Sequence, residues 1–315
     1  TMSIRADIVV QNTGKVYAIG ELTGSGTLGG GCTFDNNSTA GNNTWKVGAL
    51  NTDFTFDGAI TGSGTQFEKV GTGMMTVSAS SNFTGAATIS EGTLCINKSS
   101  AKAGLLGTGK LTVADGATLA GVGMLDNSTV TLNKGALLRP GLKETSTSGT
   151  IKLNGHNLVV GNGATIRFYI GSRSLYTKVT DVGTMIMRGV LKVDVRDGIT
   201  LTEGDEFQLW SSNTTQILTS MVLELDSIGE GLCWDTSDLE SGVLRVANSN
   251  VIEPLDTEKE VMCVVYSING VEYVRYTCKY GEAVRKLSEQ GLPKGIYTVK
   301  IATAHTEVVE KYVVK

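Results

Sequence analysis

Short alternating segments separated by glycine constrain the fold of this chain more than any other feature of its sequence. Segments such as KLTVAD, STVTLN, TIRFYI and VLKVDV alternate apolar and polar residues, and many of these residues are β-branched. This pattern predicts strands of about four to six residues joined by tight turns. Glycine accounts for 40 of the 315 residues and proline for only 3, and no convincing helix occurs before residue 280. We therefore expect an all-β protein with many turns.

Internal repeats favour a solenoid over a sandwich. LTGSGT at 22–27 recurs as ITGSGT at 60–65, and GTGMMTV at 71–77 recurs as GTGKLTV at 107–113, which are shifts of 38 and 36 residues. Gly-Ala followed closely by an aliphatic residue begins at Gly58, Gly116, Gly135 and Gly163. We interpret these repeats as degenerate coils with insertions, which stack about 4.8 Å apart and line up apolar residues inside. Glycine suits the corners of such coils, where φ must often be positive.

One segment resembles a known repeat. GTGMMTVSASSNFTGAATISEGTLCI, residues 71–96, is similar to the passenger-associated repeat of bacterial autotransporters. The matching residues are Gly71, Thr72, Gly73, Thr76, Val77, Phe83, Thr84, Gly85, Ile89, Gly92, Thr93 and Leu94. With its flanks, the resemblance covers roughly residues 15–247. It implies a right-handed parallel β-helix over about residues 1–250, in a non-catalytic structural or adhesin-like passenger module.

The last residues differ in composition from the rest. Glycine becomes scarce near residue 250, so 251–256 are predicted to be a linker and 257–315 a small antiparallel β-sandwich. This tail resembles the type IX secretion sorting domain of Bacteroidetes. The motif residues are Asn269, Gly270, Leu292, Pro293, Gly295, Ile296, Tyr297, Val299, Lys300, Lys311, Val313, Val314 and Lys315. The resemblance implies secretion machinery as a partner and an extracellular or outer-surface location in a Gram-negative bacterium. The alternative is a domain that caps the open end of the β-helix.

Charge and hydropathy bear on the partners. Lys and Arg number 27 against 31 Asp and Glu, without a basic run, so nucleic acid is not expected as a partner. No apolar run is long enough for a transmembrane segment. Glycans or proteins of the host or environment are the expected ligands.

Residues capable of catalysis are few. His156 and His305 fall in different predicted domains and are expected on the surface or in turns. The acidic groups are Asp194 with Asp197, Glu203 with Asp205 and Glu206, and Asp235 with Asp238. Because most lie beside turn glycines, we interpret them as solvated turn carboxylates, and expect no enzyme, cofactor or metal site. The alternative is a polysaccharide-active enzyme, in which at least three of these acids converge in one groove with Arg167, Arg173 or Lys178.

Tryptophan and cysteine complete the candidates. Trp45, Trp210 and Trp234 are expected to be core or end-cap residues rather than a carbohydrate platform. The five cysteines include no C-x-x-C motif. In the hairpin that turns at Asn269-Gly270, Cys263 would face Tyr276 and lie only diagonal to Cys278, a poor geometry for a disulfide.

The passenger-like repeat also predicts packing. Val77, Ile89 and Leu94 should point into the coil, and Ser90 should be exposed.

Overall fold

The computed structural model comprises two compact units, Thr1–Asn248 and Ser249–Lys315. It describes residues 1–4, 8–10, 14–30, 42–100, 103–218, 220–249, 260–267, 270–302 and 307–314. The predicted linker at 251–256 lies outside the described residues.

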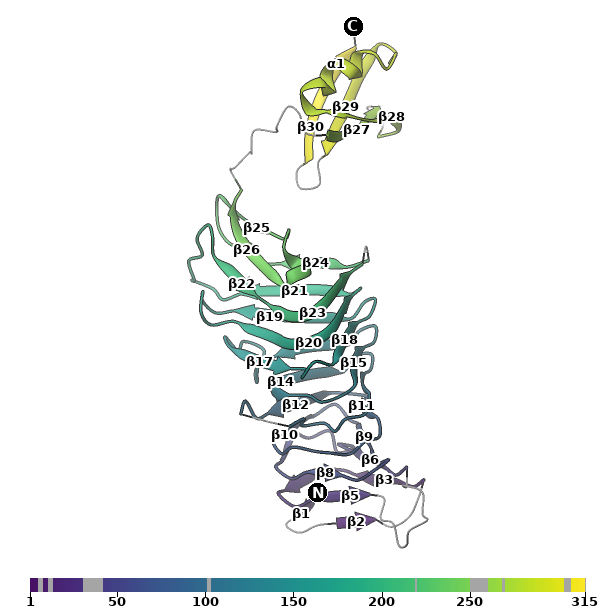
Figure 1. The fold of residues 1–315 in the computed structure, drawn as a ribbon, viewed down its shortest axis with the longest axis vertical. Coiled ribbons are helices and arrows are strands. Elements are labelled where there is room, and N and C mark those ends of the chain that lie inside the picture. Colours follow the sequence, from purple (N-terminus) through teal and green to yellow (C-terminus); the bar gives the residue numbers. More distant parts are fainter. Residues whose placement is uncertain are drawn as a thin grey trace. The chain divides into compact units, whose positions relative to one another are not determined.

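The first unit is a parallel β-helix, which confirms the predicted fold class. Its coils stack one on another along the chain (Figure 1). One face is a continuous parallel array of β1 (Met2–Ile4), β4 (Leu22–Gly24), β7 (Phe54–Phe56), β10 (Met74–Val77), β12 (Thr93–Asn97), β14 (Thr118–Met124), β16 (Leu137–Pro140), β19 (Thr165–Ile170), β21 (Val190–Val195) and β24 (Val222–Leu225).

A second face runs beside the first. It consists of β3 (Val16–Ile19), β6 (Thr44–Val47), β9 (Gln66–Lys69), β11 (Ala87–Ile89), β13 (Leu111–Val113), β15 (Thr129–Leu132), β18 (Asn157–Val160), β20 (Thr177–Met187) and β23 (Trp210–Ile217). Further strands complete the coils, namely β2 (Ile8–Val10), β5 (Leu28–Gly30), β8 (Ile60–Thr61) and β17 (Gly149–Lys152).

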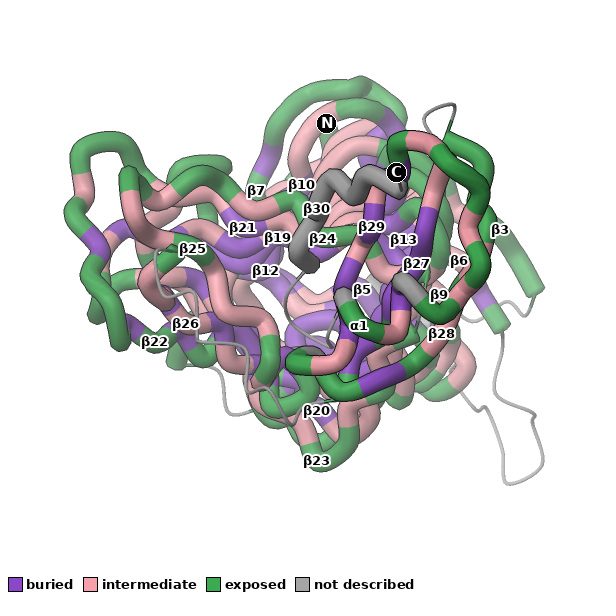
Figure 2. Tube along the Cα trace, turned by 90° about the horizontal axis from the view of Figure 1, so that it is seen from above, coloured by how far each residue is buried: buried purple, intermediate pink, exposed green. Residues whose placement is uncertain are grey.

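Apolar residues line up inside the coils because side chains alternate along each strand. Figure 2 shows this alternation as purple and pink segments along the strands. Val77, Ile89 and Leu94 are 3%, 0% and 0% exposed, which confirms their predicted inward direction. The prediction for Ser90 is wrong, because this residue is half-buried and donates a hydrogen bond to Glu68 Oε1 at 2.9 Å.

Lys69 is a charged residue among the apolar side chains that line up inside the coils. It is fully buried and lies between Val47 and Ile89 of the adjacent coils. Its Nζ donates to the backbone carbonyls of Val70 at 2.9 Å, Gly71 at 2.7 Å and Glu91 at 3.2 Å. Burial lowers the pKa of the Lys69 ammonium, and the negative charges of nearby acids act in the opposite direction. The carbonyls of a coil corner thus hold a cation at a position where aliphatic side chains normally stack.

Three of the four Gly-Ala repeats mark equivalent corners of successive coils, whereas the one at Gly58 precedes β8, which pairs with β5 instead. Ala117, Ala136 and Ala164 are all buried, and each precedes a strand of the first face. The glycine before each alanine stacks on the next, since Gly116 N donates to Gly135 O at 3.2 Å and Gly135 N donates to Gly163 O at 2.8 Å. Both donors have positive φ, 72° and 75°, a conformation that glycine adopts without strain.

The coils differ in length. Thr118 pairs with Leu137, which is 19 residues further on, whereas Leu137 pairs with Thr165, which is 28 residues further on.

The interpretation of the repeats with shifts of 36 and 38 residues as successive coils is wrong. β10, which contains part of the repeat at 71–77, pairs with β12. β13, which contains the matching residues of the repeat at 107–113, belongs to the other face. Ile60 likewise pairs with Leu28 and not with Leu22.

An antiparallel sheet ends the first unit. It has the order β22 (Glu206–Gln208), β26 (Val243–Asn248), β25 (Leu232–Asp235), with the short 3-10 helix η1 (Leu239–Ser241) before β26. Trp210 stacks on Phe168 with ring centroids 6.4 Å apart. Trp234 packs against Phe207 in a T-shaped arrangement, with ring centroids 6.0 Å apart. Trp45 and Trp210 are buried and Trp234 is half-buried, which confirms that the tryptophans serve the core.

The second unit is a four-stranded antiparallel sheet of order β28-β27-β29-β30. The strands are β27 (Glu260–Ser267), β28 (Glu272–Lys279), β29 (Gly295–Ala302) and β30 (Glu307–Val314), and η2 (Tyr280–Glu282) and α1 (Ala283–Ser288) follow β28. Ala283 and Leu287 of α1 pack in one buried cluster with Val265 and Val299 of the sheet. The predicted antiparallel unit is confirmed, and its second layer is this helix rather than another sheet.

Candidate functional site

The acidic candidates are distributed among separate ion pairs. On the outer surface of the first face, Asp194 pairs with Arg167 and lies 3.8 Å from Lys192. Lys192 Nζ is also 3.8 Å from Glu224 Oε2 on the next strand. This row of alternating charges crosses β19, β21 and β24, and each acid in it has a basic neighbour.

Asp205 and Glu206 lie elsewhere and have other partners. Asp205 is 8% exposed, accepts from Thr202 N at 2.8 Å and pairs with Arg173 at 2.9 Å. Glu206 pairs with Arg245 at 2.5 Å, and Arg245 also pairs with Asp238. These contacts fix a turn and the terminal antiparallel sheet.

The remaining candidates are Asp197, Glu203, Asp235 and Lys178. Asp197 borders a small pocket of about 230 Å³ beside Gly198, and Glu203 is exposed. Asp235 Oδ1 accepts from Ser237 N at 2.9 Å, and Lys178 lies over the ring of Tyr176, 5.6 Å from its centroid. Arg245 lies opposite both Glu206 and Asp235 in its two ladders and pairs with Asp238, whereas Arg167, Arg173 and Lys178 have other neighbours. Among the described residues, no group of three or more His, Cys, Asp and Glu side chains is placed to hold a metal ion.

The histidines do not contribute to a common site in the described part of the chain. His156 is half-buried in the turn between β17 and β18, where its backbone N donates to Leu153 O at 2.8 Å, as expected for a turn residue. His305 lies outside the described residues.

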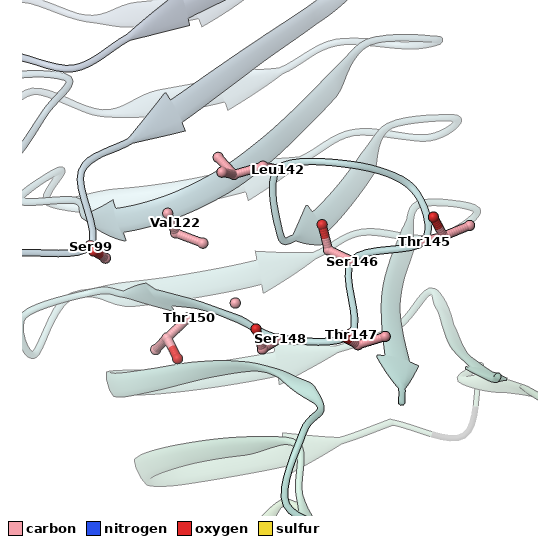
Figure 3. A pocket seen from close by; sticks show the side chains of 9 residues that line it. Ser99, Val122, Leu142, Thr145, Ser146, Thr147, Ser148 and Thr150 are labelled. Atoms are coloured by element: carbon pink, nitrogen blue, oxygen red, sulfur yellow. The ribbon is translucent and has the colours of Figure 1, made fainter. Parts of the chain in front are cut away.

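A hydroxyl-lined pocket of about 690 Å³ is the larger of the two pockets described. Figure 3 shows side chains from three segments around it, namely the end of β12, the strand β14, and the loop from β16 into β17. The lining residues are Ser99, Val122, Leu142, Thr145, Ser146, Thr147, Ser148, Gly149 and Thr150. Hydroxyls both donate and accept hydrogen bonds, and none of these lining side chains carries a charge near neutral pH. The pocket therefore suits a neutral, polar ligand better than acid–base chemistry.

The loop that forms the pocket is anchored at its first end and closed at its tip. Gly141 exchanges backbone hydrogen bonds with Gly121 of β14, at 2.8 and 3.0 Å. Ser146 Oγ accepts from Lys143 N at 2.8 Å and closes the tip of the loop. Arg139, 7% exposed, donates to Gly141 O at 3.3 Å, and burial lowers the pKa of its guanidinium. The sequence signal for this pocket is the hydroxyl-rich segment TSTSGT, which contains no charged residue.

The sorting-like motif occupies turns and strands of the second unit. Gly270 has a positive φ of 76° in the β27–β28 hairpin, and Tyr297 donates from its hydroxyl to Pro293 O at 2.9 Å. Tyr297 is buried and Ile296 is 42% exposed on β29. Lys311 lies opposite Thr298 in the β29–β30 ladder. Leu292 and Gly295 flank the turn into β29, whereas Asn269 and Lys315 lie outside the described residues.

Comparisons with known proteins leave the function to be argued from these features. No family model matches the chain, and no curated protein matches it significantly. In the part of the chain that the structure describes, no helix is long and apolar enough to cross a membrane.

Proposed function

We propose that this chain is a non-catalytic structural module displayed on, or secreted from, the surface of a Gram-negative bacterium. The observation that carries the proposal is the correspondence between the passenger-like segment and one coil. Met74 pairs with Thr93 across a single 19-residue turn of the helix. Val77, Phe83 and Leu94, three of the residues that match the autotransporter repeat, point into the core of this part of the helix. The motif residues thus serve stacking, as a passenger scaffold requires.

The ion pairs of the acids support a non-catalytic role. General acid–base catalysis needs titratable groups that converge on the reacting atoms of the substrate. The carboxylates of Asp194 and Asp205 instead form ion pairs with two different arginines. Turnover of an acidic polysaccharide by the purified chain, abolished by Asp194→Ala or Asp205→Ala, would replace this proposal with that of a polysaccharide-active enzyme.

We propose that the second unit is an export signal recognised by the type IX secretion machinery. Removal of residues 257–315 in the bacterium that encodes the chain tests this role. We expect the truncated β-helix to remain inside the cell while still folded, as shown by protease resistance of the retained protein. Normal surface display of the truncated chain would remove the export role and leave a structural one.

The hydroxyl-lined pocket favours glycan binding as a second candidate function. Its volume of about 690 Å³ lies in the range of ligand sites. On a glycan array, we expect the chain to retain neutral saccharides. The substitution Ser148→Tyr should fill the pocket and abolish retention, whereas Thr214→Tyr, an exposed position on β23, should leave retention unchanged. No retention of any glycan, or equal retention by both variants, would exclude this pocket as a glycan site.

A further inference from the structure

Two thiols meet inside the second unit. Cys263 lies on β27 opposite Tyr276, and Cys278 lies on β28 opposite Val261, so the cysteines are diagonal neighbours on one face of the hairpin. The predicted register is therefore correct. The side chains nevertheless approach each other, because their Sγ atoms are only 3.8 Å apart. Both cysteines are free thiols, 0% and 4% exposed, within the buried cluster of this unit.

We propose that Cys263 and Cys278 form a disulfide bond that closes the β27–β28 hairpin in oxidising surroundings. The bond goes beyond the proposed function and does not depend on it. A disulfide needs the sulfur atoms about 2.05 Å apart, so they must approach each other through rotation of the two side chains, a small movement of the strands, or both.

The topology of the sheet permits this approach. β28 is the terminal strand in the order β28-β27-β29-β30, and among the described strands it pairs with β27 alone. The ladder also shifts register between Val265 and Tyr266. Such an irregularity increases the local twist of the paired strands. An edge strand next to a bulge can move without breaking a second ladder.

The chemistry requires a disulfide-bearing oxidant such as oxidised glutathione. One cysteine thiolate attacks the glutathione disulfide and releases one glutathione thiolate, and the second cysteine then attacks the mixed disulfide and releases the other. The two cysteines lose two electrons and two protons in total, and one oxidised glutathione becomes two molecules of reduced glutathione.

Burial determines when the reaction occurs. Burial raises the pKa of the Cys263 thiol to about 11, and its hydrogen bond to Cys278 acts in the same direction. The reactive thiolate is therefore scarce in the folded unit. We expect oxidation to be fast during folding, when the hairpin is open, and slow once the core has closed.

The experiment uses the full chain carrying Cys32→Ser and Cys233→Ser, which leaves Cys95 as the remaining cysteine outside the pair. The chain is unfolded, refolded with oxidised glutathione, and compared with the same chain refolded under a reducing phosphine. We expect intact mass to fall by two hydrogens, and peptide mapping to join Cys263 to Cys278. Closure of this loop should raise the melting temperature of the second unit by about 5 °C or more.

The further substitution Cys278→Ser is the matched control. It should yield a chain with no internal crosslink, whose melting temperature is the same under both redox conditions. The proposal is overturned if the refolded parent keeps both thiols, if it carries only glutathione adducts, or if the crosslinked form melts below the reduced form. Each comparison is made within one variant, so a loss of stability caused by the serine itself does not affect the result.

Discussion

Leu94→Asp should destabilise the β-helix by about 4 kcal/mol or more, because it buries an unpaired charge. Leu94 is fully buried and stacks between Met75 and Leu119 of the adjacent coils, which are equally buried. Leu94 is a better choice than Ile89, whose neighbour Lys69 could compensate a carboxylate. Urea-induced unfolding followed by circular dichroism measures the change in the free energy of unfolding.

Asn97→Asp provides the control on the same strand. Asn97 is exposed at the end of β12, so the same new charge remains in water and should change the free energy of unfolding by less than about 0.5 kcal/mol. Equal midpoints for the two variants would mean that Leu94 does not face the core.

Lys69→Ala should destabilise the same unit by about 3 kcal/mol. The substitution removes three hydrogen bonds from the ammonium to backbone carbonyls and leaves a cavity where the side chain passes through the core. Lys69→Met retains most of the side-chain volume and loses only the hydrogen bonds. We therefore expect it to cost less than the alanine variant.

Lys46→Ala is the matched surface variant for this test. Lys46 lies one strand away, and its half-exposed ammonium pairs with Glu68 at 2.8 Å. An exposed ion pair contributes about 0–1 kcal/mol, so the effect of this substitution should be small. Thermal and urea unfolding of the three variants can be compared directly. A Lys69→Ala variant as stable as Lys46→Ala would show that the carbonyl contacts of Lys69 contribute little.

Local patterns predicted the fold because they report directly on strand geometry. Period-two alternation identified the inward positions of Val77, Ile89 and Leu94, and three of the four Gly-Ala repeats recur at equivalent corners. The 36-residue repeat was misleading for a physical reason. A strand that follows a glycine turn has the same local sequence on either face of the solenoid, so self-similarity alone cannot distinguish one face from the other.

Non-local contacts explain what the sequence did not predict. The charge of Lys69 suggests an exposed residue. Its ammonium is satisfied by the nearby carbonyls of Val70 and Gly71 together with the carbonyl of Glu91, 22 residues later in the chain. The approach of Cys278 to Cys263 similarly depends on side-chain direction and twist, which register alone does not specify.

The candidate pocket was missed for the same reason. Its loop is held in place by Gly121, a residue of another strand, and its lining combines three segments of the chain. The hydroxyl-rich composition of the loop alone does not show that a hollow exists.

The unequal coil lengths have an evolutionary consequence. The coil that begins at Leu137 is longer than its predecessor, and the extra residues include the pocket loop, whereas the ladder hydrogen bonds of β16 with β14 and β19 are retained. Loops of this kind can therefore be inserted, shortened or replaced while the stacked core keeps its neighbours. Such a scaffold allows the loops of the outer surface to diverge under selection that acts separately from the selection maintaining the core.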